Sequence, residues 1–531
     1  MSEKHFVHPM TGRGPFETDA NDRGNPQPNI IFISVDMVPP EFHMDLPGRV
    51  RPRTPNLDRL RTDSTVFTNA FSTSPLCTPS RASFLTGRFS YITTNSERAH
   101  DGQAIHLRDE DTIFAEYLKA AGYTARHFGK SHVGTHKFLD VFGENDSPWD
   151  RWSPPWGDDD GYRRELAAAG IDSIRFERTI RGSDPSGQGA GNSYGGWLAG
   201  LDGAPFPIEA TYPFFVARKA AETLRLLGTK APLYLQLDFF EPHQPFAICG
   251  GLEDREKEVR AAITVPESYA RLVENGFVAP WPEPRIYRLY RENWGLTSPD
   301  VMRDYLVANI LQYEILDAAI GLFLEELERL GLYESSLILF LADHGEMNGE
   351  AALIDKGAYL NPRVLRVPLF LKTVESSGRH VSRFDRPVSL LDVAPTLLDA
   401  AGISASERFD GMSLFDQLEG RERGEGAPLL AEVWSHVMPN PAVGVVFRAD
   451  DGHDYLYSFN TTDDLDELYS LEPHAEIHNL VPSHDRLHVE AIRYLDRVLA
   501  ADLRFRGYSS FLRLRHAKHL AEASGDRQVF I

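Results

Sequence analysis

Residues 30–36 read IIFISVD, a continuous apolar run that ends in an aspartate. A run of this length and composition is typical of a strand that is buried on both faces of a sheet. Similar runs recur at residues 233–239 (LYLQLDF), 337–342 (LILFLA) and 367–371 (VPLFL). We therefore expect a sheet whose strands are covered on both sides.

Segments with helical periodicity lie between these apolar runs. They cover residues 112–121, 214–226 and 302–330. Short apolar strands that alternate with amphipathic helices predict an α/β fold, with a mostly parallel sheet and helices on both faces. Ligands of such folds bind beyond the carboxyl ends of the strands. We therefore look for a site at that edge.

Chargeable residues follow three of the predicted strands at the same kind of position. Asp36 follows the first strand, Glu241-Pro242-His243 follows another, and Asp343-His344-Gly345 follows a third. A single residue of this kind is most often a turn or helix cap. Three together favour a shared site.

Cys77 is one of two cysteines in the chain and lies in the stretch SPLCTPSRASFLTG, residues 74–87. Thr78 could cap a helix and Pro79 suits its first position, so we expect a helix with Cys77 just outside its N-terminus. That end of a helix favours anions. A buried cysteine that acts only as a small apolar side chain is the alternative, and position alone does not separate the two.

Composition and charge narrow the class of protein. The chain has 531 residues, which is enough for two domains, and a formal net charge of -22. This charge argues against nucleic acid or an anionic membrane as a partner, although a local basic cluster could still bind a small anion. Two cysteines cannot form a disulfide framework, and we identify neither a transmembrane run nor a secretory signal. We therefore expect a cytoplasmic protein.

Two segments, residues 144–203 and 249–299, have the composition of long irregular insertions. Segments of this kind often form lids or binding loops, so we expect them to shape a substrate pocket. The acidic run Asp158-Asp159-Asp160-Gly161 could bind calcium. It lacks the rest of an EF-hand pattern, which favours a solvated loop.

Ordered motifs resemble those of the type I sulfatases in the alkaline phosphatase superfamily. The most specific is Cys77-Thr78-Pro79-Ser80-Arg81, followed by Leu85-Thr86-Gly87-Arg88, because Cys-x-Pro-Ser-Arg is the element that directs oxidation of the cysteine to Cα-formylglycine. Further family features occur in order at residues 54–60, 129–134, 242–246, 343–346, 355–357, 366–368, 467–471 and 479–480. The resemblance spans roughly residues 27–482.

The resemblance implies an alkaline phosphatase-like α/β domain and a smaller C-terminal α+β domain. We expect an N-terminal extension over residues 1–26, a catalytic domain over 27–420, the smaller domain over 421–503 and a tail over 504–531. The tail could contact a neighbouring subunit of a homo-oligomer, which we expect. A helix that folds back on its own domain is the alternative.

The resemblance also assigns a metal site and a nucleophile. Asp36, Asp343, His344 and the residue at position 77 would surround one divalent cation, and Arg81 would hold the hydrated formylglycine derived from Cys77. Lys130 and Lys356 would neutralise the substrate's sulfate oxygens.

Two histidines complete the set that the resemblance implies. His132 would take a proton during sulfate release, and His243 would assist the leaving group. A thiolate phosphatase loop fits less well, because its arginine lies six positions after the cysteine, where this chain has Ser83.

Two positions depart from the pattern of many sulfatases. Met37 stands where a second acidic residue is usual, and His344 stands where many arylsulfatases have asparagine. Calcium, manganese and zinc remain open as the metal, and fewer carboxylates with an added imidazole favour the last two. Phosphonate monoester hydrolases and choline-sulfatase-like proteins share this tendency.

We expect a sulfatase that acts on sulfate monoesters of small organic alcohols or phenols, matured by a formylglycine-generating enzyme. The alternative on the same fold is a phosphonate monoester or phosphodiester hydrolase, whose substrates are also tetrahedral monoanions. The match at residues 129–132 favours sulfate. A pseudoenzyme would have lost a catalytic residue, whereas the only expected acidic residue missing here is the one replaced by Met37.

Overall fold

The computed structural model describes residues 27–524 apart from gaps at 45–48, 95–105, 144–149, 151–152, 155, 158, 185–190, 201–202, 229–231, 375–381, 406–407, 424–428, 463–464, 473–477, 503 and 505. The predicted extension over residues 1–26 and the last seven residues of the tail lie outside the described residues.

A mixed sheet forms the centre of the molecule and has seven strands in the described part of the chain. In sheet order they are β12 (Arg383–Phe384), β2 (Thr65–Phe67), β11 (Leu369–Lys372), β9 (Ser336–Ala342), β1 (Asn29–Asp36), β7 (Leu233–Pro242) and β4 (Thr124–Gly129). Strands β9, β1, β7 and β4 are parallel, so their carboxyl ends meet at one edge. The predicted mostly parallel sheet is confirmed.

The expected strand over residues 367–371 is two strands. Pro368 cannot donate a backbone hydrogen bond, and the chain changes sheets there. β10 (Arg366–Val367) joins β3 (Ala70–Phe71) and β13 (Val388–Ser389) in a small sheet, while β11 runs antiparallel to β9. Strand β4 was not predicted, because its sequence TARHFG alternates polar and apolar residues instead of forming an apolar run.

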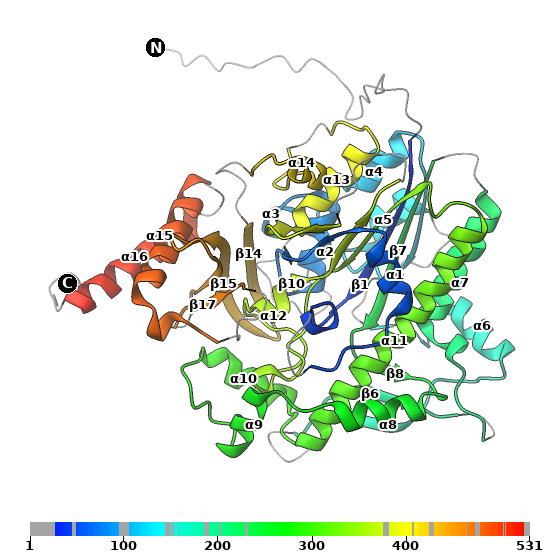
Figure 1. Ribbon diagram of the computed structural model, residues 1–531, viewed down its shortest axis with the longest axis horizontal. Helices are drawn as coiled ribbons and strands as arrows, with labels where there is room; N and C mark the ends of the chain where they lie inside the picture. Colours follow the sequence, from blue (N-terminus) through cyan, green and yellow to red (C-terminus); the bar gives the residue numbers. More distant parts are fainter. Residues whose placement is uncertain are drawn as a thin grey trace, which may run out of the picture.

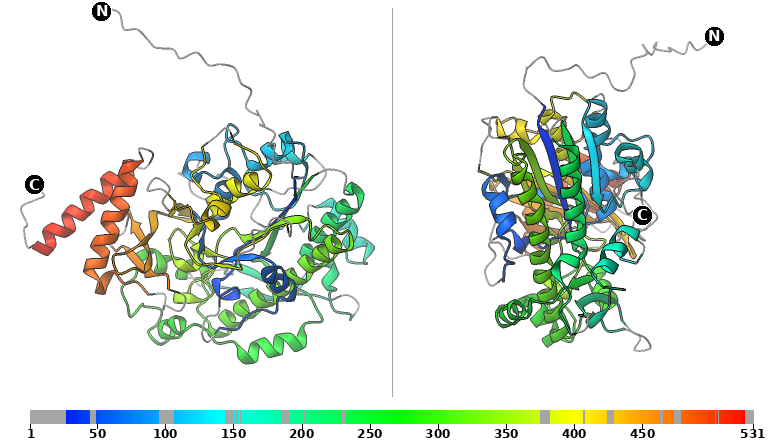
Figure 2. Two further views of the ribbon diagram at one scale, coloured as in Figure 1. Left: turned by 45° about the horizontal axis from the view of Figure 1, so that its top comes forward. Right: turned by 90° about the vertical axis from the view of Figure 1, so that its right-hand side faces the viewer.

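Helices cover both faces of the sheet (Figures 1 and 2). One layer contains α1 (Pro55–Thr62), α7 (Tyr212–Leu227) and α11 (Pro299–Arg329). The other contains α2 (Cys77–Thr86), α4 (Phe114–Ala120), α5 (Thr135–Phe142) and α13 (Val393–Ala400), with the short helices α3 (Ser90–Thr93) and α14 (Leu414–Leu418) beside it.

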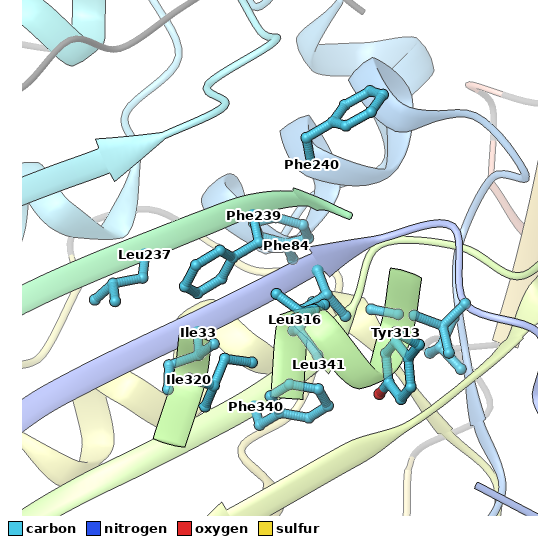
Figure 3. Close-up of a cluster of buried hydrophobic side chains, with 14 of the residues drawn as sticks. Ile33, Phe84, Leu237, Phe239, Phe240, Tyr313, Leu316, Ile320, Phe340 and Leu341 are labelled. Carbon is cyan, nitrogen blue, oxygen red and sulfur yellow. The ribbon is translucent and has the colours of Figure 1, made fainter. Parts of the chain in front are cut away.

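Buried apolar side chains join the layers. Figure 3 shows Phe84 of α2 and Leu316 and Ile320 of α11 among side chains of β1, β7 and β9. By length and composition α11 could cross a membrane, but 83% of its apolar window is buried inside the fold. That burial is what a core helix of a folded domain requires.

The two segments expected to be irregular carry regular structure. The first contains α6 (Asp160–Ala168), β5 (Phe176–Arg181) and β6 (Ser193–Leu198), and β6 pairs with both β5 and β8 (Phe246–Ile248). The second contains α8 (Glu253–Ala262), α9 (Glu267–Glu274) and α10 (Arg285–Trp294).

Their prolines and acidic residues mark helix starts. Pro266 and Pro284 precede α9 and α10, and the first turn of α8 is acidic. Asp159 of the acidic run caps α6 by accepting a hydrogen bond from the Tyr162 backbone N–H. Asp158 lies outside the described residues. A composition that we interpreted as loop therefore encodes capped helices.

A four-stranded antiparallel sheet follows the main domain. Its strands are β14 (Leu429–His436), β15 (Met438–Arg448), β16 (Asp454–Asn460) and β17 (Glu467–Ser470), covered by α15 (Asp485–Ala501). Helix α16 (Arg506–Ser524) folds back on this unit, because Arg513 pairs with Asp496 of α15 and Arg515 pairs with Asp466. The predicted smaller α+β unit is confirmed, whereas the boundary at Gly420 and the contact of the tail with a neighbouring subunit stay predictions.

Candidate active site

The predicted residues at the strand ends converge. β1 lies between β7 and β9, with Asp36 in register with Pro242 and Val35 in register with Ala342. His243 follows β7, and Asp343 and His344 follow β9. The parallel order of these strands therefore places the carboxylates and imidazoles at one edge of the sheet.

Cys77 reaches this edge as the first residue of α2. Our expectation that it lies outside the helix, with Thr78 as the cap, is wrong: the cap position is Leu76, whose extended backbone accepts from Ser80 N–H, and no side chain caps the helix. The helix starts two residues earlier than expected, at Cys77 instead of Pro79. Its side chain is buried beside charged groups, with Sγ 3.2 Å from His344 Nε2 and 3.7 Å from Asp36 Oδ1.

Four potential metal ligands form a buried cluster. One donor atom from each of Asp36, Cys77, Asp343 and His344 lies within 4.8 Å of the others. His344 donates from Nδ1 to the Gly345 carbonyl at 2.9 Å, which leaves the Nε2 lone pair for the cluster. Two carboxylates, one imidazole and the residue at position 77 are a donor set that suits a divalent cation.

The electrostatics of the cluster favour added positive charge. Burial and neighbouring Asp36 raise the pKa of Asp343. Burial lowers the pKa of His344, but Asp343 and Cys77 outweigh this effect and raise it to about 9. Asp343 and His344 therefore hold protons more strongly than usual, and a cation at this position would take over the role of those protons.

Arg81 contacts the carboxylates of both Asp36 and Asp343. Its Nε donates to Asp343 Oδ2 at 2.9 Å, and Nη2 lies 3.4 Å from Asp36 Oδ2. Nη1 donates to the Lys130 carbonyl at 2.8 Å. These contacts fix both carboxylates and the loop that carries Lys130, while the contact of Arg81 with a hydrated residue 77 stays a prediction.

Two buried lysines flank Cys77. Lys130 Nζ contacts Asp36 and lies 3.8 Å from Cys77 Sγ. Lys356 pairs with Asp355 at 3.1 Å and contacts His243 Nε2. Burial raises the pKa of Cys77, but Lys130 and Lys356 outweigh it and hold that pKa well below its usual range. The surroundings of residue 77 therefore stabilise negative charge.

Both predicted histidines are buried in the same site. His132, which has a left-handed backbone (φ 51°), is buried and interacts electrostatically with Cys77. Burial and Lys130 lower the pKa of His132, so its imidazole is neutral and can accept a proton. His243 donates from Nδ1 to the Gln244 carbonyl at 2.5 Å, which directs Nε2 to Lys356. All nine predicted site residues thus lie together.

Several supporting residues were not predicted. Asp355 accepts from Gln244 Nε2 at 2.6 Å, and Glu346 accepts from the Asp355 backbone N–H, so together they hold the loop of Lys356. Asp238, inside a run that we interpreted as apolar, accepts from His127 at 2.8 Å. The motifs at residues 242–246, 343–346 and 355–357 contained a signal for the first three.

His436 of β14 also faces this site, although it belongs to the C-terminal sheet. Its ring stacks on Tyr290 with centroids 6.2 Å apart. Burial lowers the pKa of His436 to about 4; Asp355 opposes this with a smaller effect, and Lys356 adds to it. A lone histidine on a distant strand gives no sequence signal, because only the packing of the two units brings it here.

Comparison with known proteins decides the family. The profile of the sulfatase family matches residues 28–403. The chain belongs to the sulfatase family. Members are hydrolases of sulfuric esters, and a metal ion and a formylglycine are general features of the family. The donor set around Cys77 in this sulfatase fits both a metal ion and a formylglycine at position 77.

Relatives and solved structures agree with this assignment. The sulfatase is 28% identical to the choline-sulfatase of Rhizobium meliloti (strain 1021), over 79% of this chain and 76% of that protein. It is 26% identical to an arylsulfatase of Clostridium perfringens, over 74% and 79%. Its fold matches the phosphonate monoester hydrolase of Silicibacter pomeroyi with a TM-score of 0.66, 17% identity and coverage of 90% and 96%.

Proposed function

We propose that this sulfatase hydrolyses sulfate monoesters of small organic alcohols or phenols. The observation that carries the proposal is the pair of buried lysines, Lys130 and Lys356, whose charges act on Cys77 at a metal-ligand cluster. A sulfate monoester has one negative charge spread over its oxygens, which two fixed ammonium groups in a dry pocket stabilise. The choline-sulfatase and arylsulfatase relatives support small leaving groups.

Asp36, Asp343, His344 and the residue at position 77 would hold the metal. A divalent ion there would act as a Lewis acid on the substrate's sulfate group. Met37 supplies a thioether, a poor ligand for calcium, so the donor set favours manganese or zinc. Arg81 keeps both carboxylates in place from behind through its Nε and Nη2 groups.

Maturation of Cys77 to formylglycine would require the external oxidant used by the maturation enzyme. Once hydrated, this aldehyde would offer one hydroxyl that attacks sulfur while the S–O bond to the leaving group breaks. Deprotonation of its second hydroxyl would re-form the aldehyde as the C–O bond to sulfate breaks. His132, neutral and buried beside residue 77, takes the proton of the second hydroxyl. His344 also contacts Cys77, but its Nε2 is assigned to the metal.

His243 and Lys356 act on the leaving group. The Lys356 ammonium donates to His243 Nε2, so the pair holds a proton beside the substrate's bridging oxygen. The S–O bond to the alcohol breaks as that oxygen takes the proton, because an alkoxide or phenoxide departs more readily when protonated. Lys130 stays on the sulfate oxygens.

A phosphonate monoester hydrolase is the second candidate. The observation that favours it is Met37, whose Sδ lies 3.9 Å from Lys356 Nζ where many sulfatases have a carboxylate. Without that carboxylate, the site has one negative charge fewer, so it constrains less strictly which metal and which substrate anion it binds. The match at residues 129–132 still favours sulfate.

The test is kcat/KM for 4-nitrophenyl sulfate and 4-nitrophenyl phenylphosphonate, which share one leaving phenol. Both are measured on a single metal-replete batch with the aldehyde at position 77 confirmed by mass spectrometry. We expect the sulfate to react faster by at least about tenfold, or about 1.4 kcal/mol. A preference for the phosphonate by the same factor would reverse the ranking of the two candidates.

A further inference from the structure

A second cavity lies away from the metal-ligand cluster, between the main domain and the C-terminal sheet. Its volume is about 680 Å³. It is open to solvent on one side and is lined by α9, the loop before α10, α12 (Pro362–Leu365), β10 and the end of β17. Figure 1 shows α9, α10 and α12 gathered beside β17. None of the nine catalytic-site residues lines it.

We propose that this cavity binds a small organic oxyanion, such as a carboxylate or sulfonate, with its charged group on Arg366. The proposal is independent of the reaction at Cys77. It rests on the unused hydrogen-bonding capacity of Arg366, on a second arginine in the cavity wall and on the aromatic side chains between them.

Arg366 is 8% exposed and lines the cavity without a carboxylate partner among the described residues. Its Nη2 donates to the Leu471 carbonyl at 2.8 Å. Nη1 has only the weak acceptor Met44 Sδ, at 3.9 Å, and the buried Nε has no acceptor. A guanidinium has five N–H donors, and leaving buried ones unpaired costs free energy that an oxyanion would recover.

Neighbouring Arg363, unlike Arg366, is paired with carboxylates. It lines the same cavity, and its Nη1 donates to Glu41 at 2.7 Å while Nη2 lies 3.2 Å from Glu350. Arg49 also contacts Glu350. The carboxylates in this part of the wall are therefore committed to other arginines. Burial and the positive charge of Arg363 lower the pKa of Arg366 to about 10, an environment in which an anion would be stabilising.

Arg271, which is exposed at the rim, supplies a second cation without a described carboxylate partner. Its guanidinium lies 5.1 Å from the ring centroid of Trp281, which also lines the cavity. Glu267 and Glu472 are exposed at the rim, and Glu472 pairs with His453. The committed carboxylates and the exposed rim leave Arg366 and Arg271 as the cations to which an oxyanion would bind.

The size and walls of the cavity indicate an organic ligand. Pockets of 300–1,000 Å³ lined by aromatic side chains and a few polar groups typically bind molecules of drug-like size. Trp281, Tyr287 and Tyr469 provide such walls next to the arginines. A bare inorganic ion would leave most of the volume to water, so the organic body is part of the proposal.

The test is equilibrium dialysis of radiolabelled benzenesulfonate against the full-length protein. We expect two equivalents to bind, one dependent on Lys130 at the catalytic site and one dependent on Arg366. Arg366→Met should weaken the second by about tenfold or more, and Arg271→Met by about threefold. Arg448→Met is the matched control, because Arg448 forms an exposed pair with Asp454 on the C-terminal sheet. The Arg448→Met protein should bind both equivalents of benzenesulfonate.

The remaining variants separate the possible outcomes. Because Arg366 also bonds to Leu471, Arg271→Met tests the cavity without disturbing that contact between the units. In Lys130→Met, persistence of one Arg366-dependent equivalent supports the cavity site even if the proposed function fails. A single equivalent that Lys130→Met abolishes would overturn the inference, as would normal binding in both arginine variants. Equal affinity of the cavity for inorganic sulfate would overturn the proposal that its ligand has an organic body.

Discussion

Arg81 and Arg366 are both buried arginines, but their surroundings differ. At the sheet edge, Arg81 contacts Asp343, Asp36 and a backbone carbonyl, so its charge is neutralised within the protein. In the cavity between the units, Arg366 has one carbonyl and a thioether. The first arginine organises groups that act on a ligand, whereas the second has capacity to bind one. Burial of a charge therefore does not by itself identify a binding residue; its partners do.

Replacement of Cys77 should have the largest effect on the catalytic region. Cys77→Ala removes the precursor of the nucleophile, and we expect kcat/KM to fall by about 10⁴-fold or more. The small side chain fits the helical position, so the melting temperature should stay close to that of the unaltered protein. Retention of a tenth of the activity would show that residue 77 is not the nucleophile.

Removal of the metal should come next in size. Dialysis against a chelator should lower kcat by about a thousandfold, because the ion's stabilisation of charge in the transition state is lost. Elemental analysis before and after dialysis provides a separate readout and should give one metal per chain before it. Full activity in protein shown to be free of metal would contradict the assignment of Asp36, Asp343 and His344.

Part of the catalytic site could be predicted from the sequence alone. The residues at the ends of the parallel strands were predictable from their positions; they are Asp36, His243, Asp343 and His344. Cys77 was predictable from the motif that follows it. The start of α2 was not, because Thr78 and Pro79 suit a cap that the tertiary packing of Cys77 overrides.

Contacts between distant units were beyond sequence reasoning. The break at Pro368 moves β10 into a second sheet, and Arg366 then lies against Leu471 of the C-terminal unit. His436 reaches the catalytic region in the same way. These positions depend on how two units pack, which hydrophobic periodicity within each unit does not encode.

A pair of charge deletions sharpens the comparison between the two regions. Lys130→Met should lower kcat/KM by about 10²–10³-fold, because a preorganised cation next to the substrate's sulfate is lost. Arg366→Met should change it by less than about twofold, since Arg366 lies outside the catalytic cluster. Steady-state kinetics with an aryl sulfate measures both. Equal losses would mean that the two regions form a single substrate site.

Asp355→Asn should lower activity less than the loss of Cys77, of the metal or of Lys130. Asp355 positions the Lys356 ammonium, and nearby positive charges hold its pKa below the usual range despite burial. Asparagine keeps the shape but not the charge, so we expect about a tenfold loss in kcat with little change in KM. Gln244→Met, which removes the other partner of Asp355 but leaves its charge, should cost less. A loss confined to KM would show that Asp355 binds substrate instead of positioning Lys356.

The central claim is that this sulfatase acts through an aldehyde made from Cys77 at a metal-ligand cluster. The most direct measurement is the fraction of formylglycine in the peptide that contains residue 77, determined by mass spectrometry across metal-replete preparations of different maturation, and plotted against kcat for an aryl sulfate. Our account predicts a straight line through the origin. Full activity in a preparation whose residue 77 remains a thiol would contradict it.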